Sequence, residues 1–187
     1  PSIGGVGLIK DYKKMLTMDF KEVGNIVLVI GKTEGHIDQS LFARTILDEK
    51  NGPPPEINLF NEKNNGESLL NLIDKDYIKS AHDISLGGLI TALSKMCIKG
   101  NKGIKLNKPK NLINEIEYYF AEDQSRYVIE INRENLKKVT EILKKNAVHY
   151  DELGTINEDI LFISEKTKVT IDELRASNTN WLIKYMS

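Results

Sequence analysis

The sequence of 187 residues is long enough for one ordinary domain, or for one domain with an appendage. Hydrophobic residues make up 40% and charged residues 28%, a balance typical of a soluble globular protein. Lys and Arg total 26 against 27 Asp and Glu, so the basic excess of a nucleic-acid-binding domain is missing, and no apolar run approaches the roughly 20 residues of a membrane span.

The cysteine content and the first residue indicate the setting of the chain. Cys97 is the single cysteine, and it lies inside an apolar helical pattern. One thiol cannot form an internal disulfide, so a reducing, cytoplasmic setting is expected. The chain begins at Pro1 without a methionine or a signal-like segment, so we expect either a piece cut from a longer polypeptide or an artificially chosen start.

The first 31 residues predict a linker and then a buried strand. Residues 1–10 include Gly4-Gly5-Val6-Gly7, which we interpret as a linker running into a short first strand within residues 1–20. Asn25 to Gly31 reads N-I-V-L-V-I-G. This aliphatic run ended by glycine predicts a buried strand.

The next segments alternate between loop and helix. A loop over residues 32–39 precedes a helix predicted over 40–48, which Asp38 or Ser40 can cap. Three prolines within residues 51–58 predict a stiff, extended connector. A helix is then predicted over 59–73, a strand over 77–83, and a helix over 87–99. The last of these has apolar residues at helical spacing, namely Leu89, Ile90, Leu93, Met96 and Cys97.

The remaining segments predict mostly strands with two helices. Residues 99–114 carry five lysines and no acidic residue, so we expect a solvated loop or, alternatively, an edge that faces a phosphate or a partner. The further expectations are strands over 118–120 and 126–131, a helix over 133–145, a strand pair over 148–156 and 160–164 with a turn at 157–159, a short strand over 169–171 and a closing amphipathic helix over 172–185. This order predicts an α+β fold with a mixed, largely antiparallel sheet packed with helices, an α/β sandwich with partial ferredoxin-like topology.

The segment Ser80 to Leu89, S-A-H-D-I-S-L-G-G-L, is the strongest candidate for a binding site. A strand followed by two glycines and a helix start offers free backbone N–H groups, which attract anions. The candidate phosphate- or ligand-binding residues here are His82, Asp83, Ser85, Gly87 and Gly88. The structural alternative is that Ser85 caps the helix, Asp83 bonds the turn, and the glycines permit close packing.

Two further segments carry polar residues next to predicted strands. Phe120 to Arg126, F-A-E-D-Q-S-R, provides the candidates Glu122, Gln124 and Arg126, or else forms a turn with a surface ion pair. The loop 35–41 provides Ser40, but it lacks the lysine of a P-loop. The sequence contains no metal-binding motif and no nucleophile motif, so we predict neither a metal site nor a catalytic residue.

Taken together, these segments resemble the last domain of the phosphoribosylformylglycinamidine synthase family. The hallmark S-A-H-D-x-S-D-G-G-L of that family is similar to residues 80–89, with Leu86 in place of its aspartate. Residues 120–126 resemble F-S-E-x-Q-S-R with alanine at 121, and residues 1–9 resemble P-x-x-G-G-V-G-L-I. Residues 35–41 resemble G-x-x-G-Q-S-L, but Asp38 replaces the second glycine, where it would repel an anion.

The resemblance implies that residues 1–187 are the single C-terminal domain of a larger enzyme. That enzyme would convert formylglycinamide ribonucleotide, ATP and glutamine-derived ammonia to the amidine. Its Mg and ATP sites and its catalytic histidines would lie in domains outside this chain, so no cofactor is expected in the fragment. The implied partners are the remaining domains of the parent synthase, a glutaminase subunit and a small bridging subunit, with no nucleic acid and no membrane.

The role of the domain itself stays open between two hypotheses. In the first, it is a structural and interface half that is inactive alone. In the second, the helix start at 85–89 binds a nucleotide or ribonucleotide phosphate, as in a related ATP-dependent synthetase of the aminoimidazole ribonucleotide synthetase or selenophosphate synthetase type. In the family, a segment E-S-Q of the first half touches the substrate, and Glu122-Asp123-Gln124 resembles its counterpart.

Overall fold

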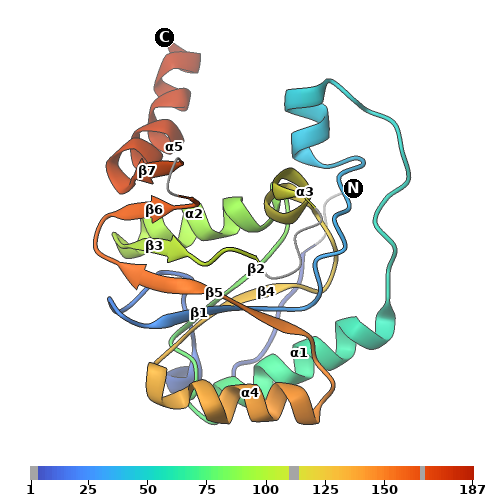
Figure 1. Ribbon diagram of the computed structural model, residues 1–187, viewed down its shortest axis with the longest axis vertical. Coiled ribbons are helices and arrows are strands. Elements are labelled where there is room, and N and C mark those ends of the chain that lie inside the picture. The colour runs from blue at the N-terminus through green and yellow to red at the C-terminus, as the bar shows by residue number, and fades with distance from the viewer. Residues whose placement is uncertain (1–3, 110–113, 165–166) are drawn as a thin grey trace.

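One mixed sheet carries the fold (Figure 1). The computed structural model describes residues 4–109, 114–164 and 167–187. The seven described strands lie in the order β2-β4-β1-β5-β3-β6-β7. They are β1 (Ile26–Ile30), β2 (Ser80–Asp83), β3 (Gly103–Leu106), β4 (Tyr127–Ile131), β5 (Tyr150–Asn157), β6 (Ile160–Phe162) and β7 (Lys168–Thr170).

Helices cover both faces of the sheet. In Figure 1, α1 and α4 lie on one side, and α2 and α3 lie on the other. The α-helices are α1 (Leu59–Asp74), α2 (Gly88–Gly100), α3 (Glu115–Phe120), α4 (Leu136–Lys145) and α5 (Ile171–Met186). Shorter helical segments are η1 (Tyr12–Lys14), the π-helical η2 (Ala43–Leu47) and η3 (Arg133–Asn135).

The sheet order confirms the expected α+β class and the partial ferredoxin-like topology. The units β1-α1-β2 and β4-α4-β5 place their strands in the order β2-β4-β1-β5. Each neighbouring pair in this set is antiparallel. The segment α2-β3-α3 is inserted between the two units, and it supplies the helices that cover the second face.

Strand β1 lies inside the sheet between β4 and β5, a position that suits its five aliphatic side chains. All five residues are buried, and Val29 pairs with Val128 of β4. Side chains alternate between the faces of a strand, so β1 contributes to two cores. Val27 and Val29 pack on the side of α2, whereas the residues between and around them pack on the side of α1 and α4.

The tyrosine-rich segment 118–120 is helical, so the expectation of a strand there is wrong. It is the last part of α3, whose start is capped by the side chain of Asn114, which accepts a hydrogen bond from Glu117 N at 2.9 Å. Tyr118 and Tyr119 are buried in the core on the α2 side. Aromatic residues favour strands on average, but a cap and a packing surface decide the local conformation here.

The lysine-rich segment and the expected hairpin also differ from the prediction. Residues 99–114 contain β3, which pairs antiparallel with β5 and parallel with β6. The expected strands over 148–156 and 160–164 exist, but β3 lies between them, so they do not form a hairpin. Asn157 accepts a hydrogen bond from Ile160 N at 3.1 Å and thereby turns the chain at the predicted place. Residues 110–113 lie outside the described residues.

The two ends of the chain pack less than the sequence suggests. Residues 4–10 form no strand, and residues 1–3 lie outside the described part of the chain. The expected C-terminal helix is present as α5, but it projects away from the sheet (Figure 1). Ile171 at its start is buried, whereas Trp181 and Tyr185 near its end are 60% and 81% exposed. None of the described helices has the length and apolar character needed to cross a membrane.

Candidate functional site

The predicted elbow between β2 and α2 exists, and its glycines are needed for packing. Gly87 and Gly88 have φ angles of 85° and 71°, which residues with a side chain rarely adopt. A Cβ on Gly88 would lie 2.7 Å from the carbonyl oxygen of Ala121. The side chain of Ser85 does not cap α2, but its carbonyl accepts a hydrogen bond from Gly88 N at 3.0 Å.

The carboxylate of Glu122 links the starts of two helices. Its Oε1 accepts hydrogen bonds from Gly87 N at 2.8 Å and from Leu41 N at 2.7 Å. Gly87 precedes α2, and Leu41 begins the helical segment that continues into η2. Negative charge is stabilised at helix starts because unpaired N–H groups point outward there. The carboxylate of Glu122 therefore occupies the place at the helix start where the sequence predicted a bound anion.

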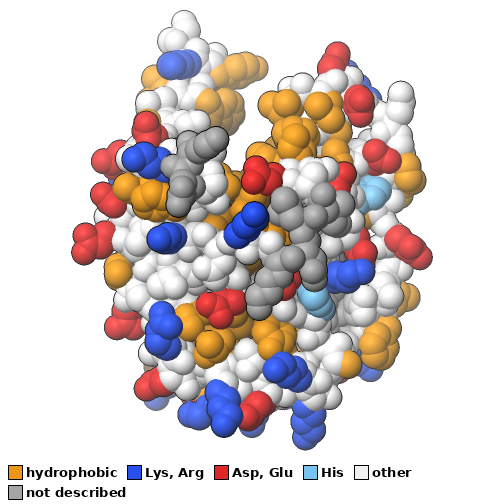
Figure 2. Space-filling view, viewed as in Figure 1, with side chains coloured by type: hydrophobic (Ala, Val, Ile, Leu, Met, Phe, Trp, Pro, Cys, Tyr) orange, Lys and Arg blue, Asp and Glu red, His pale blue; other side chains and the backbone are white. Residues whose placement is uncertain are grey.

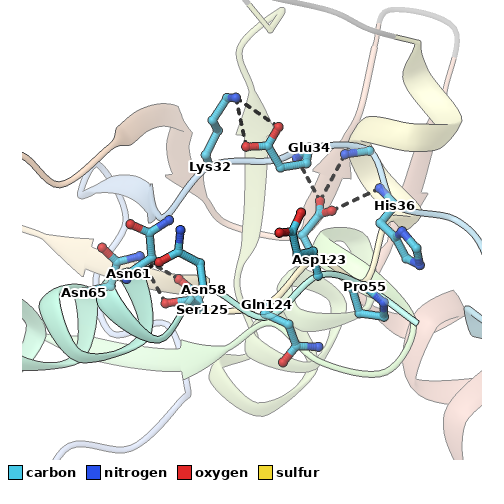
Figure 3. A pocket seen from close by; sticks show the side chains of 12 residues that line it. Lys32, Glu34, His36, Pro55, Asn58, Asn61, Asn65, Asp123, Gln124 and Ser125 are labelled. Carbon is cyan, nitrogen blue, oxygen red and sulfur yellow. Dashed lines mark hydrogen bonds and ion pairs between the residues drawn. The ribbon is translucent and has the colours of Figure 1, made fainter. Parts of the chain in front are cut away.

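The neighbouring carboxylate of Asp123 fills a second backbone loop (Figure 3). Its Oδ2 accepts from Glu34 N at 3.0 Å and from Gly35 N at 3.1 Å, and its Oδ1 accepts from His36 N at 3.0 Å. Three consecutive backbone N–H groups around one anion form the concave arrangement known as a nest. Asp123 is 6% exposed, so this loop is closed by the chain itself.

Arg126 is buried beneath these carboxylates rather than paired on the surface. It is 1% exposed and donates from Nη2 to Ala121 O at 2.5 Å and from Nη1 to Thr33 Oγ1 at 3.1 Å. Burial lowers the pKa of Arg126, and the charge of Asp123, 3.8 Å away, opposes that shift. The guanidinium thus holds the segment 121–126 in place and faces little solvent.

Five of the candidate residues line one cavity of about 330 Å³: Asp83, Ser85, Glu122, Gln124 and Arg126. Gln124 and Ser125 also line a neighbouring cavity of about 590 Å³ (Figure 3). In that second cavity, the side-chain amide of Asn65 donates to Ser125 O at 2.9 Å. The predicted residues therefore meet at one end of the sheet, where β2 ends and β4 begins.

Two candidate residues, His82 and Ser40, do not line this cavity. His82 lines a different cavity, and its Nδ1 lies 3.1 Å from Asp83 Oδ1. Its Nε2 is buried and has no hydrogen-bond partner among the described residues. Ser40 is fully buried, and its Oγ accepts from Ala43 N at 3.1 Å. Ser40 is thus the cap of the helix at 41–47, one of the two caps proposed from the sequence.

Sequence reasoning missed the importance of Asp123. We singled out its neighbours Glu122 and Gln124, whereas the carboxylate of Asp123 accepts the larger number of backbone hydrogen bonds. The only local signal was an acidic pair directly before a strand, and its partners lie 87 to 89 residues earlier in the chain. Within the described ranges, no group of three or more His, Cys, Asp or Glu side chains lies close enough together to hold a metal ion.

The sequence is similar to a described protein family and to proteins of known function. The sequence model described as "AIR synthase related protein, C-terminal domain" matches residues 22–163. The chain belongs to this family. Phosphoribosylformylglycinamidine synthase subunit PurL of Pelagibacter ubique is 69% identical over 186 residues, which are 100% of the chain but 26% of that protein. The chain thus spans about a quarter of the length of the curated relatives it matches.

Solved structures share the fold of this AIR synthase related domain. Thermotoga maritima PurL complexed with FGAR has a TM-score of 0.71 and 18% identity, covering 87% of this chain and 30% of that one. Escherichia coli HypE, a hydrogenase maturation protein, has a TM-score of 0.58 and 18% identity, covering 85% of this chain and 52% of that one. At such identities the likeness shows the fold alone.

Proposed function

We propose that this chain is the C-terminal domain of a phosphoribosylformylglycinamidine synthase. The parent protein would be an ATP-dependent carbon–nitrogen ligase that makes formylglycinamidine ribonucleotide from formylglycinamide ribonucleotide and glutamine-derived ammonia. The observation that carries the proposal is the 69% identity to the Pelagibacter PurL over the whole chain. The motifs at residues 80–89 and 120–126 support it, because the structure brings them together at one cavity.

Within the parent, we assign this domain a structural role and no catalytic residue. The polar groups at this end of the sheet bind one another: Glu122 accepts from Gly87 N at the elbow, and Asp123 accepts from the loop at 34–36. The chain alone would then have no amidine-forming activity. Mg and ATP would act in the domains outside these residues, in a cytoplasmic enzyme.

The remaining domains of the parent are the partner that we propose for the exposed apolar surface. Figure 2 shows hydrophobic side chains over the protrusion formed by α5 and over the one that contains η2. Trp181, Tyr185 and Met186 on α5, and Ile46 in η2, are each at least 60% exposed. Large exposed apolar surface marks a binding face, and about three quarters of the relatives' length lies outside this chain. A glutaminase subunit and a small bridging subunit would complete the assembly.

An alternative function is the binding of a nucleotide or ribonucleotide phosphate in a related ATP-dependent synthetase. The cavity of about 330 Å³ at the elbow favours it, because Ser85, Gln124 and Arg126 line that cavity. We rank it second, because Arg126 donates to Ala121 and Thr33 and is fully buried.

A domain exchange tests the proposed function. The corresponding quarter of the Pelagibacter PurL is replaced by this chain, and amidine formation is measured with ATP, formylglycinamide ribonucleotide and ammonia. We expect the chimera to be active and the 187-residue chain alone to be inactive. A chimera that carries the matching domain of E. coli HypE is the control, and we expect it to be inactive. A folded but inactive exchange with this chain, or turnover by the chain alone, would contradict the proposal.

A further inference from the structure

Five backbone N–H groups from three separate segments converge on two adjacent carboxylates. They come from the loop at 34–36, from the helix start at 41 and from the elbow at 87. Helix starts and nests of this kind are the elements that bind phosphate in other proteins. In this chain the acceptors are the side chains of Glu122 and Asp123.

We propose that Glu122 is an internal substitute for a phosphate group, and that the elbow of this domain is closed to anions. A phosphate bound at the elbow would need the N–H groups of Gly87 and Leu41, and Glu122 Oε1 already accepts from both, at 2.8 and 2.7 Å. Like charges at contact distance repel, so the carboxylate and a phosphate cannot share these donors. Glu122 acts as a positioning residue that fixes the start of α2 against the helix at 41–47.

The backbone that carries Glu122 is fixed by hydrogen bonds at this residue and at its two neighbours. The backbone N–H of Glu122 donates to His36 O at 3.0 Å. The next residue, Asp123, is held by the loop at 34–36, and the preceding carbonyl of Ala121 accepts from buried Arg126. Moving this backbone away from the elbow would break these contacts, so the Glu122 side chain extends toward the elbow from a fixed position. The closed state is therefore built into the packed domain.

The charges around the cavity also disfavour the binding of an anion. Glu62 and Asp83 line the cavity together with Glu122, which gives three carboxylates on its wall. Arg126 also lines it, but the guanidinium is buried against Ala121 and Thr33. A cavity with this balance of charge disfavours an anion. These contacts close the elbow whichever enzyme the parent is.

Titration with inorganic pyrophosphate tests the proposal on the 187-residue chain. The amide resonances of Leu41 and Gly87 are followed by NMR in the wild type, in Glu122→Ala and in Glu62→Ala. Glu62→Ala is the matched control, because it removes a negative charge from the same cavity and frees none of these N–H groups. We expect Glu122→Ala to bind pyrophosphate at least about tenfold more tightly than either other protein, with both resonances moving.

Two results would overturn the proposal. One is wild-type binding of pyrophosphate that moves the Gly87 and Leu41 resonances. The other is a gain in Glu122→Ala no larger than in Glu62→Ala. If Glu122→Ala does not fold, Glu122→Gln is tested instead, because its neutral amide oxygen accepts these two hydrogen bonds more weakly than the carboxylate does. Amide hydrogen exchange at Gly87 and Leu41 should then be faster than in Glu62→Gln, and unchanged exchange would refute the role of Glu122.

Discussion

The carboxylate of Glu130 accepts a hydrogen bond from Lys21 N at 2.8 Å, across 109 residues of the chain. Glu130 lies in β4, is fully buried and also accepts from Glu22 N, Asn25 Nδ2 and Ser80 Oγ at 2.7 to 3.0 Å. Burying a carboxylate is costly unless its oxygens are well bonded. These four donors satisfy both oxygens and tie the segment 21–25 and strand β2 to strand β4.

The first prediction follows from this arrangement. Glu130→Gln replaces one acceptor oxygen by an NH₂ group that faces two existing donors, so we expect a loss of about 2–4 kcal/mol in the free energy of unfolding. Chemical denaturation measures it. Glu134→Gln, at an exposed position, is the control and should change stability by less than about 0.5 kcal/mol. Equal stability of the two variants would show that Glu130 does not hold the N-terminal segment.

The second prediction compares two glycines in helices. Gly88→Ala should lower the free energy of unfolding by about 2–5 kcal/mol, because φ is 71° and the new Cβ would meet Ala121 O at 2.7 Å. Gly66→Ala, inside α1, should raise it by about 0.5–1 kcal/mol, because a Cβ there would meet only Tyr127 Oη at 3.9 Å. Thermal unfolding measures both changes. The same sign for the two would contradict the assigned packing of the elbow.

The elements that were predicted from the sequence are those with a strong local pattern. The run I-V-L-V-I became β1, and the spacing from Leu89 to Cys97 became α2. The errors arise where distant pairing decides the structure. β3 is recognisable only through its partners β5 and β6, and no local pattern in the lysine-rich segment predicts which strands it joins.

In the candidate site, too, the features with a local sequence pattern were predicted and those that depend on distant contacts were not. Glycine spacing located the elbow at 87–88, because a sharp turn between a strand and a helix needs those residues. The occupation of the elbow by Glu122, and of the loop at 34–36 by Asp123, was not predictable, because the hydrogen-bond partners lie 35 to 89 residues away. Sequence reasoning finds backbone that can bind an anion, whereas only the fold shows which anion is already there.

The third prediction concerns the thiol of Cys97. Burial raises its pKa from 9.0 to about 12. The folded state favours the neutral thiol, so this contribution to stability is complete below pH 9 and is lost as the pH rises from about 9 to 12. Cys97→Ala should therefore show a weaker decline of the free energy of unfolding over that range than the wild type, measured by denaturation at several pH values.

The reactivity of the same thiol provides an independent measurement. A thiol reagent at pH 8 should leave Cys97 unmodified in the folded chain, because the thiolate is the nucleophile and the side chain is fully buried. One thiol should react after unfolding. Rapid labelling of the folded chain would contradict the burial of this face of α2.

The last prediction concerns the start of α5, where Thr170 and Glu173 form a capping box. The backbone N–H of Thr170 donates to Glu173 Oε2 at 2.8 Å and its hydroxyl at 2.7 Å, and these bonds lower the pKa of Glu173 below 4.5, the backbone bond most. Stability from this pair is present above the ordinary pKa of a glutamate and is lost as the pH falls through the lowered pKa. Thr170→Ala should raise the pKa of Glu173 only part of the way to 4.5, because the backbone donor remains.

NMR titration measures the pKa of Glu173 in each variant. Thr179→Ala, which removes a hydroxyl bonded to Arg175 O later in α5, should leave this pKa unchanged. An equal shift in both variants would show that the capping box does not set the charge at the start of this helix.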